Sequence, residues 1–120
     1  MQDQHLSRLF RSAGAIGLTI PISMKSLADI LHEAMIRNEV GTDQQDAYLR
    51  ITVSRGAGDL GLDPALCSSP TVVVMAQPLV PPASHLYETG VKLIVASTKR
   101  NLPSALSPQI KSTNFLNNIQ

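Results

Sequence analysis

Two short segments with different hydrophobic patterns constrain the fold most strongly. From Ala47 to Arg55, apolar and polar residues alternate, which predicts a strand with one apolar face and one polar face. From Thr71 to Ala76 the chain is almost uninterruptedly apolar, which is typical of a central strand buried on both faces. A third apolar run, Val91 to Ala96, follows Gly90 and predicts a third strand. A sheet of this kind needs helices to cover its apolar faces.

Two amphipathic helices are predicted ahead of these strands. In the first, over about residues 3–16, apolar residues recur at helical spacing. Ser23 is predicted to cap the second helix, whose apolar stripe runs from Leu27 to Met35 and which ends at Gly41, before a polar turn at 43–46. A last helix is predicted to start near Thr113. Helices followed by strands, without βαβ alternation, predict an α+β fold.

Composition narrows the classes of function. The net charge of +1 gives no indication of a nucleic-acid or membrane surface. The single Cys67 excludes an internal disulfide framework and indicates a reducing compartment, so we expect a cytoplasmic protein. No apolar run approaches the roughly 20 residues that span a bilayer. The histidines His5, His32 and His85 lack metal-ligand spacing, so we expect no metal site.

The loop from Gly56 to Gly61 matches the pattern G-x-G-x-x-G and follows a predicted strand. A dinucleotide-binding fingerprint must also open a helix, whose N-terminus holds the pyrophosphate. The next predicted element is the strand at Thr71, which leaves no room for a full crossover helix, so this function is disfavoured. The loop is then either a mobile turn whose glycines allow positive φ, or a loop that closes over a ligand with its backbone N–H groups.

Two cationic side chains are candidate functional groups. Arg50 shares the polar face of its predicted strand with Tyr48, and that face is either solvated or lines a cavity in which arginine binds a carboxylate. Lys111 lies between a proline-rich segment and the predicted last helix. Such a residue is most often a plain surface lysine, but a lysine can form a Schiff base when burial or neighbouring cations favour its neutral form.

Three segments in chain order resemble the signatures of the class IV (fold-type IV) pyridoxal-phosphate aminotransferases. His5–Ala13 resembles the family's H-x-x-R-L-x-x-S-A helix, Tyr48–Arg50 together with Arg55–Pro64 resembles its strand and glycine loop, and Lys111–Asn118 resembles its K-S-x-N-Y-L-N-N signature. The family includes branched-chain amino acid aminotransferases, D-amino acid aminotransferases and aminodeoxychorismate lyases. Any one of these motifs is weak alone, and the three together in order are strong.

The resemblance implies pyridoxal 5'-phosphate as cofactor, an amino acid and a 2-oxo acid as substrates, and a homodimer. It implies that Lys111 forms the Schiff base with the cofactor and then moves the substrate's α-proton. Arg8 matches the arginine that contacts the cofactor phosphate. Arg50 falls on the substrate side of the site, and the loop with Gly61 and Leu62 borders the pocket.

The resemblance also divides the chain. Residues 1–97 correspond to most of the small N-terminal domain, a few-stranded, largely antiparallel sheet with two packed helices. Residues 98–110 correspond to the interdomain linker, and residues 111–120 to the truncated beginning of the cofactor-binding domain. No Asp or Glu follows Lys111, so no partner for the pyridine nitrogen comes from that end, and we expect the isolated chain to be inactive. The alternatives are an aminodeoxychorismate lyase, a D-amino acid transaminase, or a non-catalytic small domain that dimerises.

Overall fold

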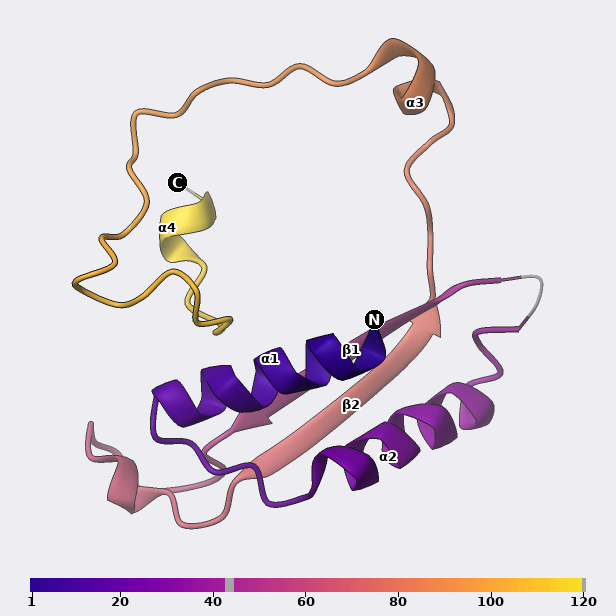
Figure 1. Cartoon of the computed structure of the whole chain (residues 1–120). Coiled ribbons are helices and arrows are strands. Elements are labelled where there is room, and N and C mark those ends of the chain that lie inside the picture. The colour runs from indigo at the N-terminus through magenta and orange to yellow at the C-terminus, as the bar shows by residue number, and fades with distance from the viewer. Residues whose placement is uncertain (43–44, 120) are drawn as a thin grey trace.

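The computed structural model describes residues 1–42 and 45–119. Asp43 and Gln44, in the predicted polar turn, and Gln120, at the end of the predicted segment 111–120, lie outside the described residues. The elements, in chain order, are α1 (Gln2–Ala15), α2 (Met24–Arg37), β1 (Ala47–Ser54), a 3-10 turn (Pro64–Leu66), β2 (Thr71–Pro78), α3 (His85–Thr89) and α4 (Leu116–Ile119) (Figure 1). The predicted α+β class is confirmed.

The sheet of the described residues is an antiparallel pair, β1 with β2, in which Ile51 lies opposite Val74. The strands are joined by the glycine-rich loop, which contains the 3-10 turn and no longer helix. Gly56 in this loop has φ 89°, and a Cβ there would lie 1.8 Å from the Ser69 carbonyl oxygen. The loop therefore lacks the helix that a dinucleotide fingerprint requires, and its first glycine serves a close backbone approach.

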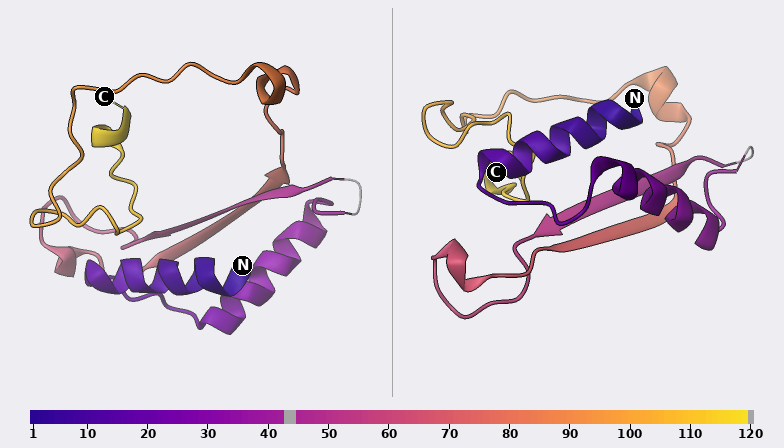
Figure 2. Two further views of the ribbon diagram at one scale, coloured as in Figure 1. Left: turned by 45° about the horizontal axis from the view of Figure 1, so that its top comes forward. Right: turned by 60° about the horizontal axis from the view of Figure 1, so that its bottom comes forward.

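Helices α1 and α2 cover the same face of this sheet, and the core lies between the helices and the strands (Figure 2). Leu6 of α1 and Leu27 of α2 are almost completely buried, at 1% and 0% exposure. The sheet contributes half-buried apolar side chains to the same cluster: Leu49, Ile51, Val72 and Val74. Burying one leucine side chain stabilises a fold by about 2 kcal/mol, so the predicted helical stripes provide the main packing energy.

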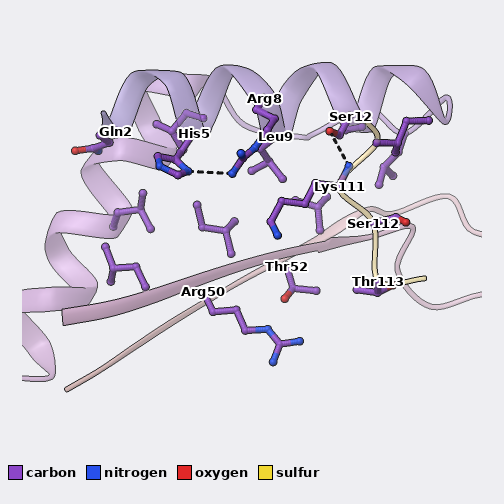
Figure 3. A pocket seen from close by; sticks show the side chains of 18 of the residues that line it. Gln2, His5, Arg8, Leu9, Ser12, Arg50, Thr52, Lys111, Ser112 and Thr113 are labelled. Atoms are coloured by element: carbon purple, nitrogen blue, oxygen red, sulfur yellow. Dashed lines mark hydrogen bonds between the residues drawn. The ribbon is translucent and has the colours of Figure 1, made fainter. Parts of the chain in front are cut away.

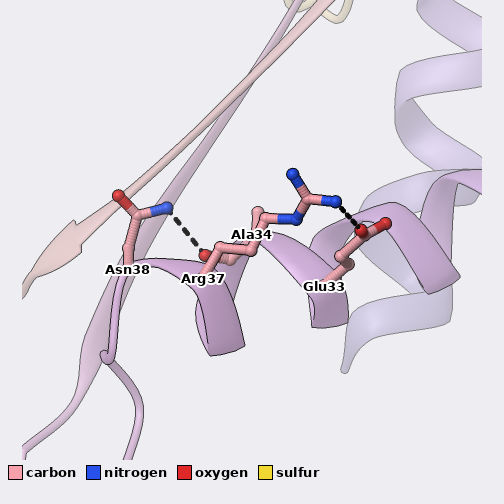
Figure 4. A network of polar contacts seen from close by, with 4 residues as sticks. All are labelled: Glu33, Ala34, Arg37 and Asn38. Atoms are coloured by element: carbon pink, nitrogen blue, oxygen red, sulfur yellow. Dashed lines mark hydrogen bonds and ion pairs between the residues drawn. The ribbon is translucent and has the colours of Figure 1, made fainter.

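Helix α2 is stabilised at both ends by local contacts. The Ser23 hydroxyl oxygen accepts a hydrogen bond from the Ser26 backbone N–H at 3.0 Å, which confirms the predicted cap. In the last turns, Arg37 pairs with Glu33 at 2.5 Å, and the Asn38 side-chain amide donates to the Ala34 carbonyl oxygen at 2.8 Å (Figure 4). The helix ends at Arg37 rather than at Gly41, because Asn38 already takes up a free carbonyl there.

Two predictions about the strands are wrong. The segment Val91–Ala96 forms no strand, and its Val95 is fully exposed. A strand needs the backbone of a neighbour, and this segment runs away from both β1 and β2 (Figure 1). Strand β2 is not buried on both faces either, since Val73 and Met75 are about half exposed. The helices cover only the other face of the sheet, so the outer face stays open.

After β2 the chain leaves the sheet, forms α3, and returns so that residues 110–115 lie beside α1 (Figure 1). Asn117 anchors this returning segment, accepting from the Asn101 backbone N–H at 2.8 Å and donating to the Lys99 carbonyl oxygen at 2.9 Å. Helix α4 begins at Leu116, after the predicted start near Thr113. Residues 98–110 contain no helix or strand, and the division into domains stays a prediction. Among the described helices, none has the length and apolar character needed to cross a membrane.

Candidate active site

A cavity of about 1000 Å³ lies between α1, β1 and the returning segment of residues 110–115 (Figure 3). Apolar side chains of α1, α2 and β1 form much of its wall. Its polar lining residues are Gln2, His5, Arg8, Ser12, His32, Tyr48, Arg50, Thr52, Lys111, Ser112 and Thr113. Arg8, Arg50 and Lys111, the three cationic residues predicted from the sequence, therefore border one cavity, although they are up to 103 positions apart in the chain (111 − 8 = 103).

Helix α1 presents four polar side chains to this cavity: Gln2, His5, Arg8 and Ser12. His5, Arg8 and Ser12 follow one another at spacings of three and four, which places them on one helical face. The Arg8 guanidinium donates a hydrogen bond to His5 Nδ1 at 3.0 Å. Because that nitrogen accepts, His5 orients the guanidinium without neutralising its charge. Arg8 itself is half-buried in the wall of the cavity.

Lys111 enters the cavity from the returning segment. Its backbone N–H donates to the Ser12 hydroxyl oxygen at 3.2 Å, and its side chain lies between α1 and β1 (Figure 3). Ser12 is only 6% exposed. The amino group of Lys111 thus shares the space in front of α1 with Arg8, and it reaches that space because its backbone is fixed to the same helix.

Arg50 borders the cavity from a different side. Strand β1 pairs with β2 along one edge only, and the cavity extends around the other edge, so residues from both faces of β1 line it. Arg50 lies on the outer face, and its guanidinium points away from α1 (Figure 3). A ligand that contacts both Arg50 and Lys111 must therefore pass the free edge of β1.

The charged side chains that line the cavity are all basic. No Asp or Glu is among its lining residues, and among the described residues no carboxylate lies within ion-pair distance of Arg8, Arg50 or Lys111. Uncompensated arginines and lysines in a concave site are suited to phosphate and carboxylate ligands. In the part of the chain that the structure describes, His, Cys, Asp and Glu form no group of three or more that could hold a metal ion.

Comparison with known families identifies the chain's relatives. The family described as amino-transferase class IV matches residues 2–120. The chain belongs to the class IV aminotransferases. It is 38% identical, over 99% of its length, to a putative branched-chain-amino-acid aminotransferase of Methanocaldococcus jannaschii, of which it covers 39%. It is 29% identical to a chloroplastic D-amino-acid transaminase of Arabidopsis thaliana (98% of this chain, 29% of the relative), and 27% identical to an aminodeoxychorismate lyase of Bacillus subtilis (98% and 38%).

The chain thus spans about two fifths or less of the length of these class IV relatives. The resemblance inferred from the three ordered motifs is confirmed at the level of the family. The roles of individual residues are a separate matter, which rests on the geometry of the cavity.

The structure does not bring Gly61 and Leu62 to this cavity. Both lie in the loop between β1 and β2, outside the lining, and the Leu62 side chain is fully exposed. The loop follows the C-terminal end of β1, at Ser54 (Figure 1). Their place on the substrate side of a class IV site stays a prediction.

Reasoning from the sequence gave no individual structural role to two polar residues that line this cavity. Ser12 stood only within the His5–Ala13 motif, yet it is the buried polar side chain found among the described residues. His5 was weighed as a metal ligand and was otherwise named only as the first residue of the same motif. The spacing His5, Arg8, Ser12 was the signal that could have identified both, because a polar stripe beside an apolar stripe indicates a second functional face of the helix.

Proposed function

We propose that this chain supplies the lysine and the phosphate-binding wall of a pyridoxal-phosphate-dependent aminotransferase, which moves an amino group between an amino acid and a 2-oxo acid. The observation that carries the proposal is that Lys111 and Arg8 share one cavity whose lining contains no Asp or Glu. A nucleophilic amine beside an uncompensated guanidinium suits a ligand that has both a carbonyl group and a phosphate.

Each cationic residue has its own task in this proposal. Arg8, oriented by His5, binds the phosphate through charge-assisted hydrogen bonds. Lys111 would hold the cofactor at its carbonyl group through the amino nitrogen, and its amino group would take and return the proton at the substrate's α-carbon. Arg50 binds the substrate carboxylate at the free edge of β1. Pyridoxal phosphate, when bound, supplies the electron sink that lowers the cost of removing that proton.

The residues of the cavity fit one end of the cofactor better than the other. The phosphate and the carbonyl group find Arg8 and Lys111, whereas the pyridine nitrogen finds no carboxylate among the lining residues. A carboxylate at that nitrogen is what keeps it protonated and makes the ring an effective electron sink. We therefore propose that the 120-residue chain by itself attaches the cofactor but completes little or no amino transfer.

Covalent labelling tests this proposal directly. The chain is mixed with pyridoxal phosphate, the product is reduced with borohydride, and mass spectrometry of peptides locates the attached group. We expect the label at Lys111, its loss in Lys111→Ala, and its retention in the matched control Lys99→Ala, which removes an exposed lysine outside the cavity. Arg8→Gln should leave the labelled position unchanged but raise the cofactor concentration needed. Equal labelling of Lys25, Lys92, Lys99 and Lys111 would refute the proposal.

The substrate side admits alternatives within the family. The relatives named above include a putative branched-chain-amino-acid aminotransferase, a D-amino-acid transaminase and an aminodeoxychorismate lyase. A panel of branched-chain L-amino acids, D-amino acids and aminodeoxychorismate, offered to an active protein that contains this chain, separates the three. Product analysis distinguishes the lyase, because a lyase releases pyruvate without consuming a 2-oxo acid.

A non-catalytic role in association is the second candidate, and exposed apolar side chains favour it. Leu93, Ile94 and Val95 are at least 87% exposed, and Val73 and Met75 on the outer face of the sheet are about half exposed. Surfaces of this kind commonly mark protein interfaces, and we propose a homodimer. Light scattering across a range of concentrations tests it. A chain that stays monomeric at high concentration contradicts the association role and leaves the labelling test untouched.

A further inference from the structure

We propose that Ser12 is a positioning residue for Lys111, which holds the backbone of the lysine against α1 and so fixes where its amino group acts. This inference rests on the proposed function for the role of Lys111. The contact itself is a feature of the fold and can be tested without any cofactor.

The burial of Ser12 needs an explanation. It lies in the last turns of α1 at 6% exposure, next to the buried Ala13, where an alanine would favour the helix more. A buried hydroxyl costs stability unless it forms a hydrogen bond. Ser12 meets this requirement with a partner 99 residues away, the Lys111 backbone N–H. The position therefore holds a residue that can accept a hydrogen bond from the Lys111 backbone, rather than one that favours the helix more strongly.

The local structure around Lys111 gives this bond a positional effect. The segment has no helix or strand from Val91 to Phe115, so its own hydrogen-bond ladder does not fix it. The Ser112 N–H donates to the Ile110 carbonyl oxygen at 3.1 Å, which forms only a tight local turn. The bond to Ser12 joins this turn to a regular helix, and it does so at the lysine itself.

The geometry of α1 then relates Lys111 to Arg8. Ser12 follows Arg8 by four residues, which corresponds to about one turn, or about 6 Å along the helix axis. One face of this rigid helix thus carries the Arg8 guanidinium and, one turn later, the Ser12 hydroxyl to which the Lys111 backbone is bonded. A ligand whose phosphate binds Arg8 meets Lys111 at a separation set by the helix rather than by the loop.

The experiment uses three variants of α1. Ser12→Ala removes the acceptor and keeps the helix, Ser12→Thr keeps a hydroxyl, and Ser7→Ala removes an exposed serine from the same helix. Amide hydrogen exchange of Lys111 is measured without cofactor. We expect exchange about fivefold faster in Ser12→Ala, because one hydrogen bond of average net strength is lost, and little change in the other two variants.

The second measurement follows the initial rate of borohydride-fixed labelling by pyridoxal phosphate at Lys111. We expect a several-fold slower rate in Ser12→Ala and rescue in Ser12→Thr, with Lys25, Lys92 and Lys99 labelled at unchanged rates. Unchanged exchange at Lys111 in Ser12→Ala overturns the inference, as does faster exchange without slower labelling. Absence of label at Lys111 in the unaltered chain instead overturns the proposed function, whatever the exchange data give.

Discussion

Arg55 joins α1 to the end of β1, and its replacement is the sharpest test of how the site is held together. Its guanidinium donates two hydrogen bonds to backbone carbonyl oxygens just after α1, to Ile16 at 2.5 Å and to Gly17 at 3.2 Å. Helix α1 has no basic residue in its last turn, so Arg55 supplies the cation that its C-terminus lacks. Arg55→Met keeps the apolar stem and removes both donors.

The expected loss follows from these two bonds. A hydrogen bond from a charged group is worth about 1.5–3 kcal/mol net when it is well buried. Arg55 is half-buried, so we take about 1 kcal/mol for each bond and about 2 kcal/mol in total. For a chain of this size that corresponds to a fall in Tm of roughly 8 °C. Arg55→Lys, which retains the charge but not the fork of donors, should lose about half as much.

Urea and thermal unfolding, followed by circular dichroism, measure this loss. The matched control is Arg11→Met, which removes an exposed arginine of α1 that has no hydrogen bond or ion pair among the described residues. Its effect should stay within about 0.5 kcal/mol. If Arg55→Met and Arg11→Met are equally stable, loss of an arginine charge alone explains both stabilities. The hydrogen bonds from Arg55 to the Ile16 and Gly17 carbonyl oxygens then make no net contribution to stability.

Four further substitutions test the core, a helix cap and two glycines by the same unfolding assay. Leu27→Ala should cost about 3 kcal/mol, because the side chain is fully buried at the centre of the core; a loss under 1 kcal/mol would contradict that packing. Ser23→Ala should cost about 1 kcal/mol through loss of the cap of α2, and Ser23→Thr should restore most of it. Gly14→Ala should stabilise by about 0.5–1 kcal/mol, since the site is helical and nothing lies within 4 Å of the added Cβ. Gly56→Ala should destabilise by several times that amount, because φ is 89° and the new Cβ would meet the Ser69 carbonyl oxygen; equal effects of the two alanines would show that the backbone argument is wrong.

The helices were predictable because their signal is local. Apolar residues at helical spacing, with Ser23 as a cap, define α2 before any contact is known, and the same stripe supplies Leu27 to the core. Strand β1 was predictable for a related reason, since alternation from Ala47 indicates one covered face. In each case the residues that form the element also form the core, so one hydrophobic pattern predicts both the secondary structure and the buried residues.

The third strand was not predictable because a strand depends on its neighbour. Val91–Ala96 has the apolar composition of a strand, yet composition says nothing about which edge it would pair with. The same limit applies to β2. Its apolar run would suit burial on both faces, but whether a second layer covers Val73 and Met75 depends on where the helices pack.

The residues of the cavity also differ in how far the sequence predicts them: the charged residues were predicted, and the residues that connect its walls were not. Arg8, Arg50 and Lys111 stood out as cations within motifs, and the structure places all three around one cavity. The residues that attach its walls to one another act instead through single side chains on distant backbone groups: Ser12 on the Lys111 N–H, and Arg55 on the carbonyl oxygens after α1. The spacing of His5, Arg8 and Ser12 marks a polar face of α1, but it does not reveal which distant backbone group Ser12 contacts.

These two attachments act on the same helix, and this gives α1 a central place in the site. Arg55 fixes the backbone just after its C-terminal end to the strand that carries Arg50, and Ser12 fixes its last turns to the segment that carries Lys111. Arg8 lies on the helix one turn before Ser12. Because a helix rises by a constant 1.5 Å per residue, the position of Arg8 relative to Lys111 depends on rigid geometry, whereas Arg50 depends on the path of β1. Weakening the Ser12 contact should therefore disturb the proposed labelling at Lys111, and weakening the Arg55 contact should disturb the position of α1 relative to β1.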